Sequence, residues 1–170
     1  MVVKGPRKTA NGFDLSQAPS HMLRRCVQYA NDLFSRETGA SDLTKQQFIV
    51  LAAVEQNEGA SQTDLVALTG IDRSTLAEMV RRMIEKGHLM RERTEADQRA
   101  NAVRVAPLGR KALRGARSAG DKVERTLLAS LPVADRAKFA KMLSAIVTAA
   151  EASEGQGPDE PRRPAGRRSR

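Results

Sequence analysis

The residues best suited to chemistry in this sequence are polar and basic side chains between positions 73 and 82. If this stretch is helical, its apolar residues fall on one face and these side chains on the remaining surface. Such a surface suits the major groove of duplex DNA, because arginine contacts guanine in a bidentate way and hydroxyl groups reach bases or phosphates. The residues predicted to make these contacts are Arg73, Ser74, Thr75, Glu78 and Arg82.

Glu78 has two interpretations. Its carboxylate can accept a hydrogen bond from cytosine N4 on the groove floor, whereas its charge repels the phosphates. Alternatively, Glu78 pairs with Arg82 at the i, i+4 spacing and only solvates the helix. Both interpretations stay open at the level of sequence.

A second basic group follows in residues 88–106, where the spacing of apolar residues changes from helical to alternating and predicts a β-hairpin with a polar tip at 95–100. An arginine at the end of a hairpin can enter a minor groove, which makes Arg99 a candidate, and Asp97 can orient its guanidinium. Arg91, on the first strand, is a further candidate. The alternative for Asp97 is a turn-forming residue among solvated charges.

Start and stop signals predict the helices that position these side chains. Ser61 with Asp64 three residues later begins a short helix with Leu65 and Leu68 facing inward, and Gly70 ends it. Asp72 caps the longer helix that follows and ends near Gly87. A helix, a tight glycine turn and a second helix have helix-turn-helix spacing. Two further predicted DNA contacts at the start of the short helix are Gln62 and Thr63.

Four other helices are expected around this segment. One begins near Pro19, a second has a capping box of Thr44 and Gln47, a third begins at Pro107, and a fourth near Val133. The helices at the two ends each carry an apolar stripe that a winged helix does not need, which favours a helical dimerisation lobe. The inward positions expected for the helix from Pro107 are Leu108, Ala112, Ala116, Ala119, Val123 and Leu127.

Length and composition predict one domain in a chain of 170 residues. The fold class is mainly α with a small β-hairpin. The predicted domain covers 18–152, with the winged helix-turn-helix at 44–106 and dimerisation helices at 18–38 and 107–152. Residues 1–17 form a predicted flexible arm and 153–170 a disordered basic tail.

A net charge of +9 points to a polyanionic partner, with nucleic acid first and an anionic membrane surface second. The single cysteine excludes an intramolecular disulfide, and His21 and His88 lie in no metal-ligand pattern. No cofactor or metal is therefore expected. The sequence shows neither a signal peptide nor a spanning segment, so a cytoplasmic protein without a membrane partner is expected.

From Leu43 to Leu113 the sequence resembles the MarR family of bacterial regulators, named for multiple antibiotic resistance. The resemblance implies a homodimer with two winged lobes on one face of double-stranded DNA. It also implies that the helix after Asp72 is the recognition helix. Ala106 departs from the family, which commonly has threonine before this proline. The ordered residues that carry the resemblance are Ile71-Asp72-Arg73-Ser74-Thr75-Leu76, Lys86-Gly87, Asp97-Gln98-Arg99 and Gly109.

The resemblance also implies a small effector, most often an aromatic carboxylate or a related acyl thioester, bound between the two lobes. Guanidinium groups suit its anion and rings suit its aromatic body. The expected function is a repressor that such a ligand releases from a palindromic operator. The candidate ligand-binding residues are Arg24, Arg25, Tyr29 and Phe48.

Three alternatives remain. Cys26 resembles the thiol of redox-sensing members, although its position in an apolar stripe favours an inert core cysteine. A winged helix can also serve protein or RNA contacts instead of duplex DNA. An enzyme is disfavoured, because the sequence contains no glycine-rich phosphate loop, catalytic triad arrangement or metal-ligand spacing.

Overall fold

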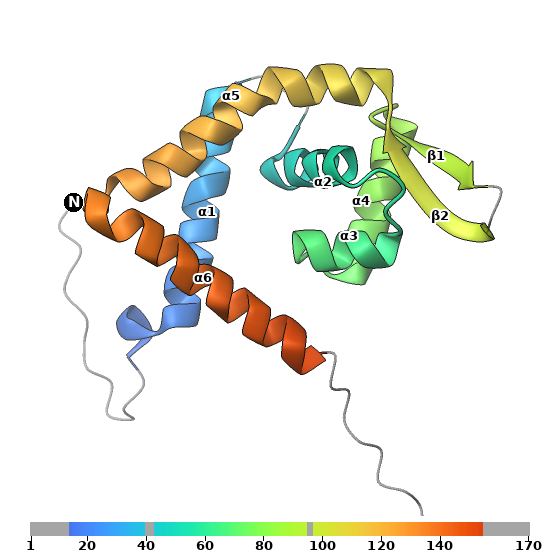
Figure 1. Ribbon diagram of the computed structural model, residues 1–170. Coiled ribbons are helices and arrows are strands. Elements are labelled where there is room, and N and C mark those ends of the chain that lie inside the picture. The colour runs from blue at the N-terminus through green and yellow to red at the C-terminus, as the bar shows by residue number, and fades with distance from the viewer. Residues whose placement is uncertain (1–13, 40–42, 95–96, 155–170) are drawn as a thin grey trace, which may run out of the picture. The chain divides into compact units, whose positions relative to one another are not determined.

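The computed structural model describes residues 14–39, 43–94 and 97–154, and the side chains of 92–101 and 154 lie outside this description. Most of the predicted arm and tail therefore also lies outside the described residues. The described chain is helical apart from one two-stranded antiparallel sheet, which confirms the predicted fold class (Figure 1). In chain order its elements are the 3-10 helix η1 (Leu15–Gln17), α1 (Pro19–Thr38), α2 (Lys45–Gln56), α3 (Gln62–Thr69), α4 (Arg73–Glu85), β1 (Leu89–Thr94), β2 (Asp97–Val105), α5 (Pro107–Ala129) and α6 (Val133–Glu154).

The helices begin where their capping residues predicted. Thr44 and Gln47 form a reciprocal capping box, in which the Gln47 amide donates to Thr44 Oγ1 and the Thr44 amide donates to Gln47 Oε1. α1 and α5 begin at Pro19 and Pro107, and neither has a side-chain cap. For α5 this follows from Ala106, which has no hydroxyl to accept from the first turn.

The chain divides into two compact units, one ending at Ser130 and one beginning at Leu131. The first unit holds one hydrophobic core, to which α1 to α5 and the hairpin contribute. α5 packs along α1 and α2, and α4 packs against α3 and β1. The largest fully buried side chains are Phe34, Leu51, Leu65, Leu76, Met83, Leu89 and Leu113.

Five of the six inward positions predicted for α5 are buried or packed against the core, and Leu108 is the exception. Leu108 is 51% exposed, whereas Gly109 and Leu113 are buried. A Cβ at Gly109 would overlap the His88 carbonyl oxygen, so the first turn of α5 lies directly against the chain that enters β1. The prediction of Leu108 as an inward residue was wrong because periodicity counts side chains and gives no weight to a glycine that lets two backbones approach.

The prediction for α3 was half right. Leu65 is fully buried, but Leu68 is 52% exposed beside the loop that follows α2. α3 is only eight residues long and packs against α2 and α4, and its contact with the core is made by Leu65 and the partly buried Val66.

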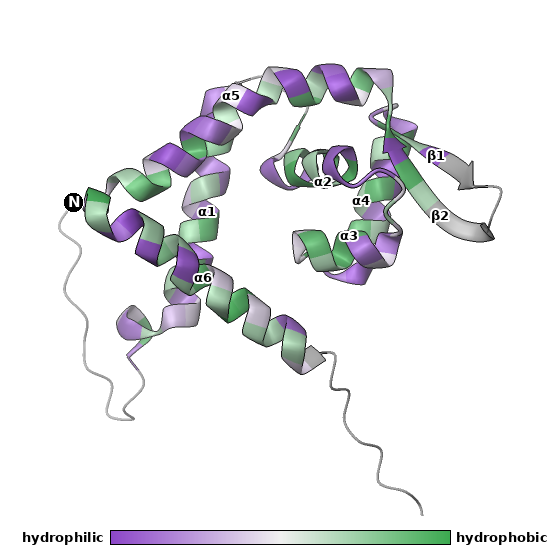
Figure 2. Cartoon of the chain, in the orientation of Figure 1, coloured by the Kyte–Doolittle hydropathy of each residue, from purple (hydrophilic) through white to green (hydrophobic). Residues whose placement is uncertain are grey.

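The second unit contains α6, which runs from Val133 to Glu154. Hydrophobic and hydrophilic residues alternate along this helix in Figure 2. The apolar side chains nevertheless stay open to solvent, including Met142 at 57% and Ile146 at 59% exposure. A part of α1 shares this property, since Met22, Leu23 and Val27 are also exposed. Both helices therefore carry apolar residues that one chain does not cover.

Candidate nucleic-acid interface

Capping hydrogen bonds determine where α3 and α4 begin. Ser61 and Asp64 form a capping box at the start of α3, and the Ser61 amide donates to Asp64 Oδ2 at 2.8 Å. Gly70 ends α3 in the left-handed conformation, with φ of 64° and ψ of 14°, which a residue with a Cβ adopts only with strain. Asp72 then caps α4 by accepting from the Thr75 amide at 2.9 Å.

The polar side chains at the start of α4 are exposed and already ordered. Arg73 Nη2 donates to Thr63 Oγ1 at 3.0 Å, which joins the first turn of α4 to the first turn of α3. Ser74 Oγ donates to Asp72 Oδ1 at 2.7 Å. The hydrogen bonds from Thr75 and Ser74 lower the pKa of Asp72 to about 2, so this cap stays ionised. The structure thus brings together the predicted contacts Thr63, Arg73 and Ser74.

Glu78 lies one turn further along α4 and makes three hydrogen bonds. Arg81 donates to it from Nη2 at 2.7 Å and from Nε at 2.9 Å, and Arg82 donates from Nε at 2.7 Å. Arg81 also pairs with Glu85. These donors lower the pKa of Glu78 to about 2, and the same contact raises the pKa of Arg81. The predicted pairing of Glu78 with Arg82 is confirmed.

A hollow of about 380 Å³ lies over the exposed face of α4. Five of its lining residues belong to α4 and the sixth, Gln47, comes from α2. Sequence reasoning gave Gln47 only a capping role and did not include Arg81 among the contacts. The spacing of Arg81 from Glu78 and Glu85 was a usable signal, whereas the approach of Gln47 depends on how α2 packs. The lining residues are Gln47, Ser74, Thr75, Glu78, Met79 and Arg82.

The wing is an antiparallel hairpin in which Leu89 pairs with Val105 and Arg91 with Val103. Arg91 is exposed, as a contact residue must be. Asp97 pairs with Thr94 and already belongs to β2, so the second strand begins earlier than the predicted tip at 95–100. The side chains of Asp97 and Arg99 lie outside the described part of the chain, and their pairing stays a prediction.

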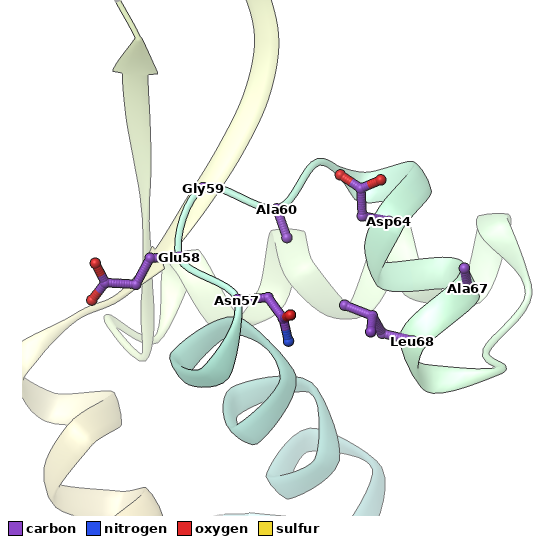
Figure 3. A pocket seen from close by; sticks show the side chains of 7 residues that line it. All are labelled: Asn57, Glu58, Gly59, Ala60, Asp64, Ala67 and Leu68. Atoms are coloured by element: carbon purple, nitrogen blue, oxygen red, sulfur yellow. The ribbon is translucent and has the colours of Figure 1, made fainter.

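A second and larger hollow, of about 550 Å³, lies between the end of α2 and α3 (Figure 3). The residues around it include the acidic Glu58 and Asp64 and the exposed Leu68, and the Glu58 side chain points away from Leu68 in Figure 3. Asp64 is held by the Ser61 cap, whose hydrogen bonds lower its pKa. Two carboxylates repel a phosphate backbone, so this hollow is not part of the candidate interface.

The four candidate ligand-binding residues fall into two groups. Arg24, Arg25 and Tyr29 are exposed on α1. Phe48 is instead partly buried and packs against the core, with its ring centroid 5.2 Å from that of Phe34. A Cβ at Gly120 of α5 would lie 2.7 Å from Phe48 Cζ, so this ring fills the space between α2 and α5.

Cys26 is exposed on α1, so the expectation of a cysteine buried in the core is wrong for the single chain. Within the described residues, no three His, Cys, Asp or Glu side chains gather into a group that can hold a metal ion. Among the described helices, none combines the length and apolar character needed to cross a bilayer.

Comparison with known proteins places this site in a family. The MarR family's sequence model matches residues 41–100. The transcriptional regulator HosA of Escherichia coli O127:H6 is 32% identical over 123 residues, which cover 72% of this chain and 90% of HosA.

Two solved structures share the fold. A structure reported for the regulation of DNA binding of Bordetella bronchiseptica BpsR by 6-hydroxynicotinic acid has a TM-score of 0.72 and 26% identity, and the match covers 80% of this chain and 97% of BpsR. The transcriptional regulator PcaV of Streptomyces coelicolor, in complex with its natural ligand, has a TM-score of 0.71 and 28% identity, with 82% and 98% covered.

The helix-turn-helix, its wing and the polar face of α4 define a transcriptional regulator of the winged helix-turn-helix class. More closely, the chain belongs to the MarR family.

Proposed function

We propose that this regulator is a homodimeric repressor that binds a palindromic operator and is released by a small aromatic anion. The exposed start of α4 carries the proposal, because Arg73 is held in place by Thr63 and stands next to Ser74 and Thr75. Side chains that are ordered before binding lose less conformational entropy when they contact bases. The further proposed contacts are Gln62, Glu78, Arg82, Arg91, Asp97 and Arg99.

The apolar faces of α1 and α6 support a homodimer. Met142 and Ile146 are more than half exposed in the single chain, as is Val27 on α1. Exposed apolar surface on each of these helices favours association. A two-fold dimer would present two α4 helices to half-sites about one helical turn of DNA apart, which requires an imperfect palindrome.

The effector is proposed from the relatives and from α1. BpsR responds to 6-hydroxynicotinic acid, a small aromatic acid. Arg24 and Arg25 offer guanidinium groups for a carboxylate, and Tyr29 offers a ring. Phe48, which is partly buried and packs against Phe34, is the fourth proposed residue of this site. Such a ligand would favour a spacing of the two α4 helices that no longer fits the operator.

Selection from randomised duplexes tests the DNA-binding part of this proposal. The enriched sequences should be palindromic, and Arg73→Ala should weaken binding to them by about tenfold or more, as expected for loss of a base contact worth about 1–3 kcal/mol. Arg125→Ala removes an equal charge from the exposed surface of α5 and should change affinity less than about twofold. A selection without palindromic enrichment would contradict the proposal.

The effector part is tested by thermal shift with aromatic carboxylates and their coenzyme A thioesters. A ligand that binds the folded dimer must raise its melting temperature and should also dissociate the operator complex. Arg24→Ala and Arg25→Ala should weaken both responses. Release of the operator by hydrogen peroxide, abolished by Cys26→Ser, would instead support the redox alternative.

A further inference from the structure

Glu78 is placed to control two arginines of the recognition helix at once. Its carboxylate accepts hydrogen bonds from Arg81 and Arg82, all three side chains are exposed, and Glu78 lines the hollow over the α4 face. Because α4 contains three arginines and two glutamates, its formal charge is only +1. Removing Glu78 alone would double that charge.

The contact with Glu78 competes with contacts to DNA. A guanidinium has a fixed set of donors, and Arg81 uses Nε and Nη2 on Glu78 and Nη1 on Glu85. To bind a phosphate, Arg81 must leave at least one carboxylate or bring that carboxylate close to the polyanion. Since the pKa of Glu78 is lowered to about 2, its negative charge persists throughout the neutral range.

The cost of separating these groups depends on the DNA sequence. On non-cognate DNA the arginines find phosphates, but the carboxylate is left facing like charge. On a cognate site the arginines can contact guanine, and the Glu78 carboxylate can accept from an exocyclic amino group of cytosine. Separating Glu78 from Arg81 and Arg82 is therefore compensated only on DNA whose base edges bind both the arginines and the carboxylate.

We propose that Glu78 is a specificity-determining residue that restrains Arg81 and Arg82 and so weakens binding to non-cognate DNA more than binding to the operator. This inference rests on the proposed function, in which α4 reads the operator. It assigns Arg81 a part in DNA binding. In this proposal Glu78 has both roles in turn: it pairs with the arginines in the free protein and contacts a base on the operator.

The test compares wild type, Glu78→Gln and Glu85→Gln on the selected operator and on a scrambled duplex of equal length and composition. Glu78→Gln should raise affinity for the scrambled duplex by about three- to tenfold, and operator affinity should rise less, so discrimination falls. The slope of log affinity against log salt on the scrambled duplex should steepen by about 0.9 for each additional phosphate that the freed arginines neutralise.

Glu85→Gln is the matched control, because it removes the same charge from the same helix, and among the described residues Glu85 forms its ion pair with Arg81 and not with Arg82. It should leave discrimination within about twofold of wild type. The proposal is overturned if Glu78→Gln leaves discrimination and salt slope unchanged, if it weakens both duplexes equally, or if Glu85→Gln has the same effect. Failure of the wild-type protein to enrich any operator would overturn the proposed function, which separates the two failures.

Discussion

The helices α4 and α6 both carry apolar residues at helical spacing, but only α4 buries them within its own unit. Leu76, Val80 and Met83 of α4 are at most 2% exposed. Met142 and Ile146 of α6 are exposed by more than half. Periodicity therefore predicts which residues need cover, and it does not say whether the same chain or another one supplies it.

The largest effect is expected from charges placed on the exposed apolar face of α6. The double variant Met142→Asp/Ile146→Asp should weaken the proposed homodimer by at least about 1,000-fold, because each new charge occurs twice across a two-fold interface. Analytical ultracentrifugation would show a monomer, and operator binding would be lost. Thr148→Asp places a charge on the opposite side of α6 and should leave the assembly intact. If the double variant still forms dimers, α6 is not part of the dimer interface.

A smaller effect is expected from a cavity in the core of the DNA-binding lobe. Leu65→Ala should lower the free energy of unfolding by about 2–5 kcal/mol, because this side chain of α3 is fully buried. Leu68→Ala changes the same residue type one turn later, where the side chain is 52% exposed, and should cost less than about 1 kcal/mol. Urea denaturation monitored by circular dichroism measures both. Equal losses would mean that Leu68 is covered in the assembled protein.

The smallest effect concerns two glycines of α5. Gly109→Ala should destabilise the protein by about 1–3 kcal/mol, because its Cβ would overlap the His88 carbonyl oxygen. At Gly115 a Cβ meets nothing within 4 Å, so Gly115→Ala should stabilise the helix by up to about 1 kcal/mol. Thermal melts of the two variants should thus shift in opposite directions. A rise in both would show that the start of α5 can move away from β1.

Local chemistry explains how much of the fold could be predicted. Ser61 with Asp64, Gly70 and Asp72 act within a few residues of the chain, so their capping and turn roles are visible in the sequence and recur in the structure. Contacts between elements are different. The position of Gln47 beside the α4 face depends on how α2 packs, and sequence spacing contains no record of it.

In the candidate site, too, contacts within one helix could be predicted and contacts between helices could not. The pair of Glu78 and Arg82 follows from helical spacing and was predictable, whereas the hydrogen bond from Arg73 to Thr63 crosses between helices and was not. Phe48 was a candidate for both the core and a ligand site, and it packs against Phe34. Sequence alone cannot separate the two roles, because an aromatic side chain on a helix looks the same whether a ligand or a core receives it.

The base of the wing is fastened to α5 on both strands. The Ala106 amide donates to the His88 carbonyl at 3.0 Å, and Arg110 Nη1 donates to the Val105 carbonyl at 2.6 Å. Gly109 closes the remaining gap against His88. The base of the hairpin and the first turn of α5 are therefore joined, so α5 cannot rotate at this end without moving the hairpin or breaking these contacts. An effector that turns α5 would therefore move the wing as well. Such an effector would lower DNA affinity without acting through α4.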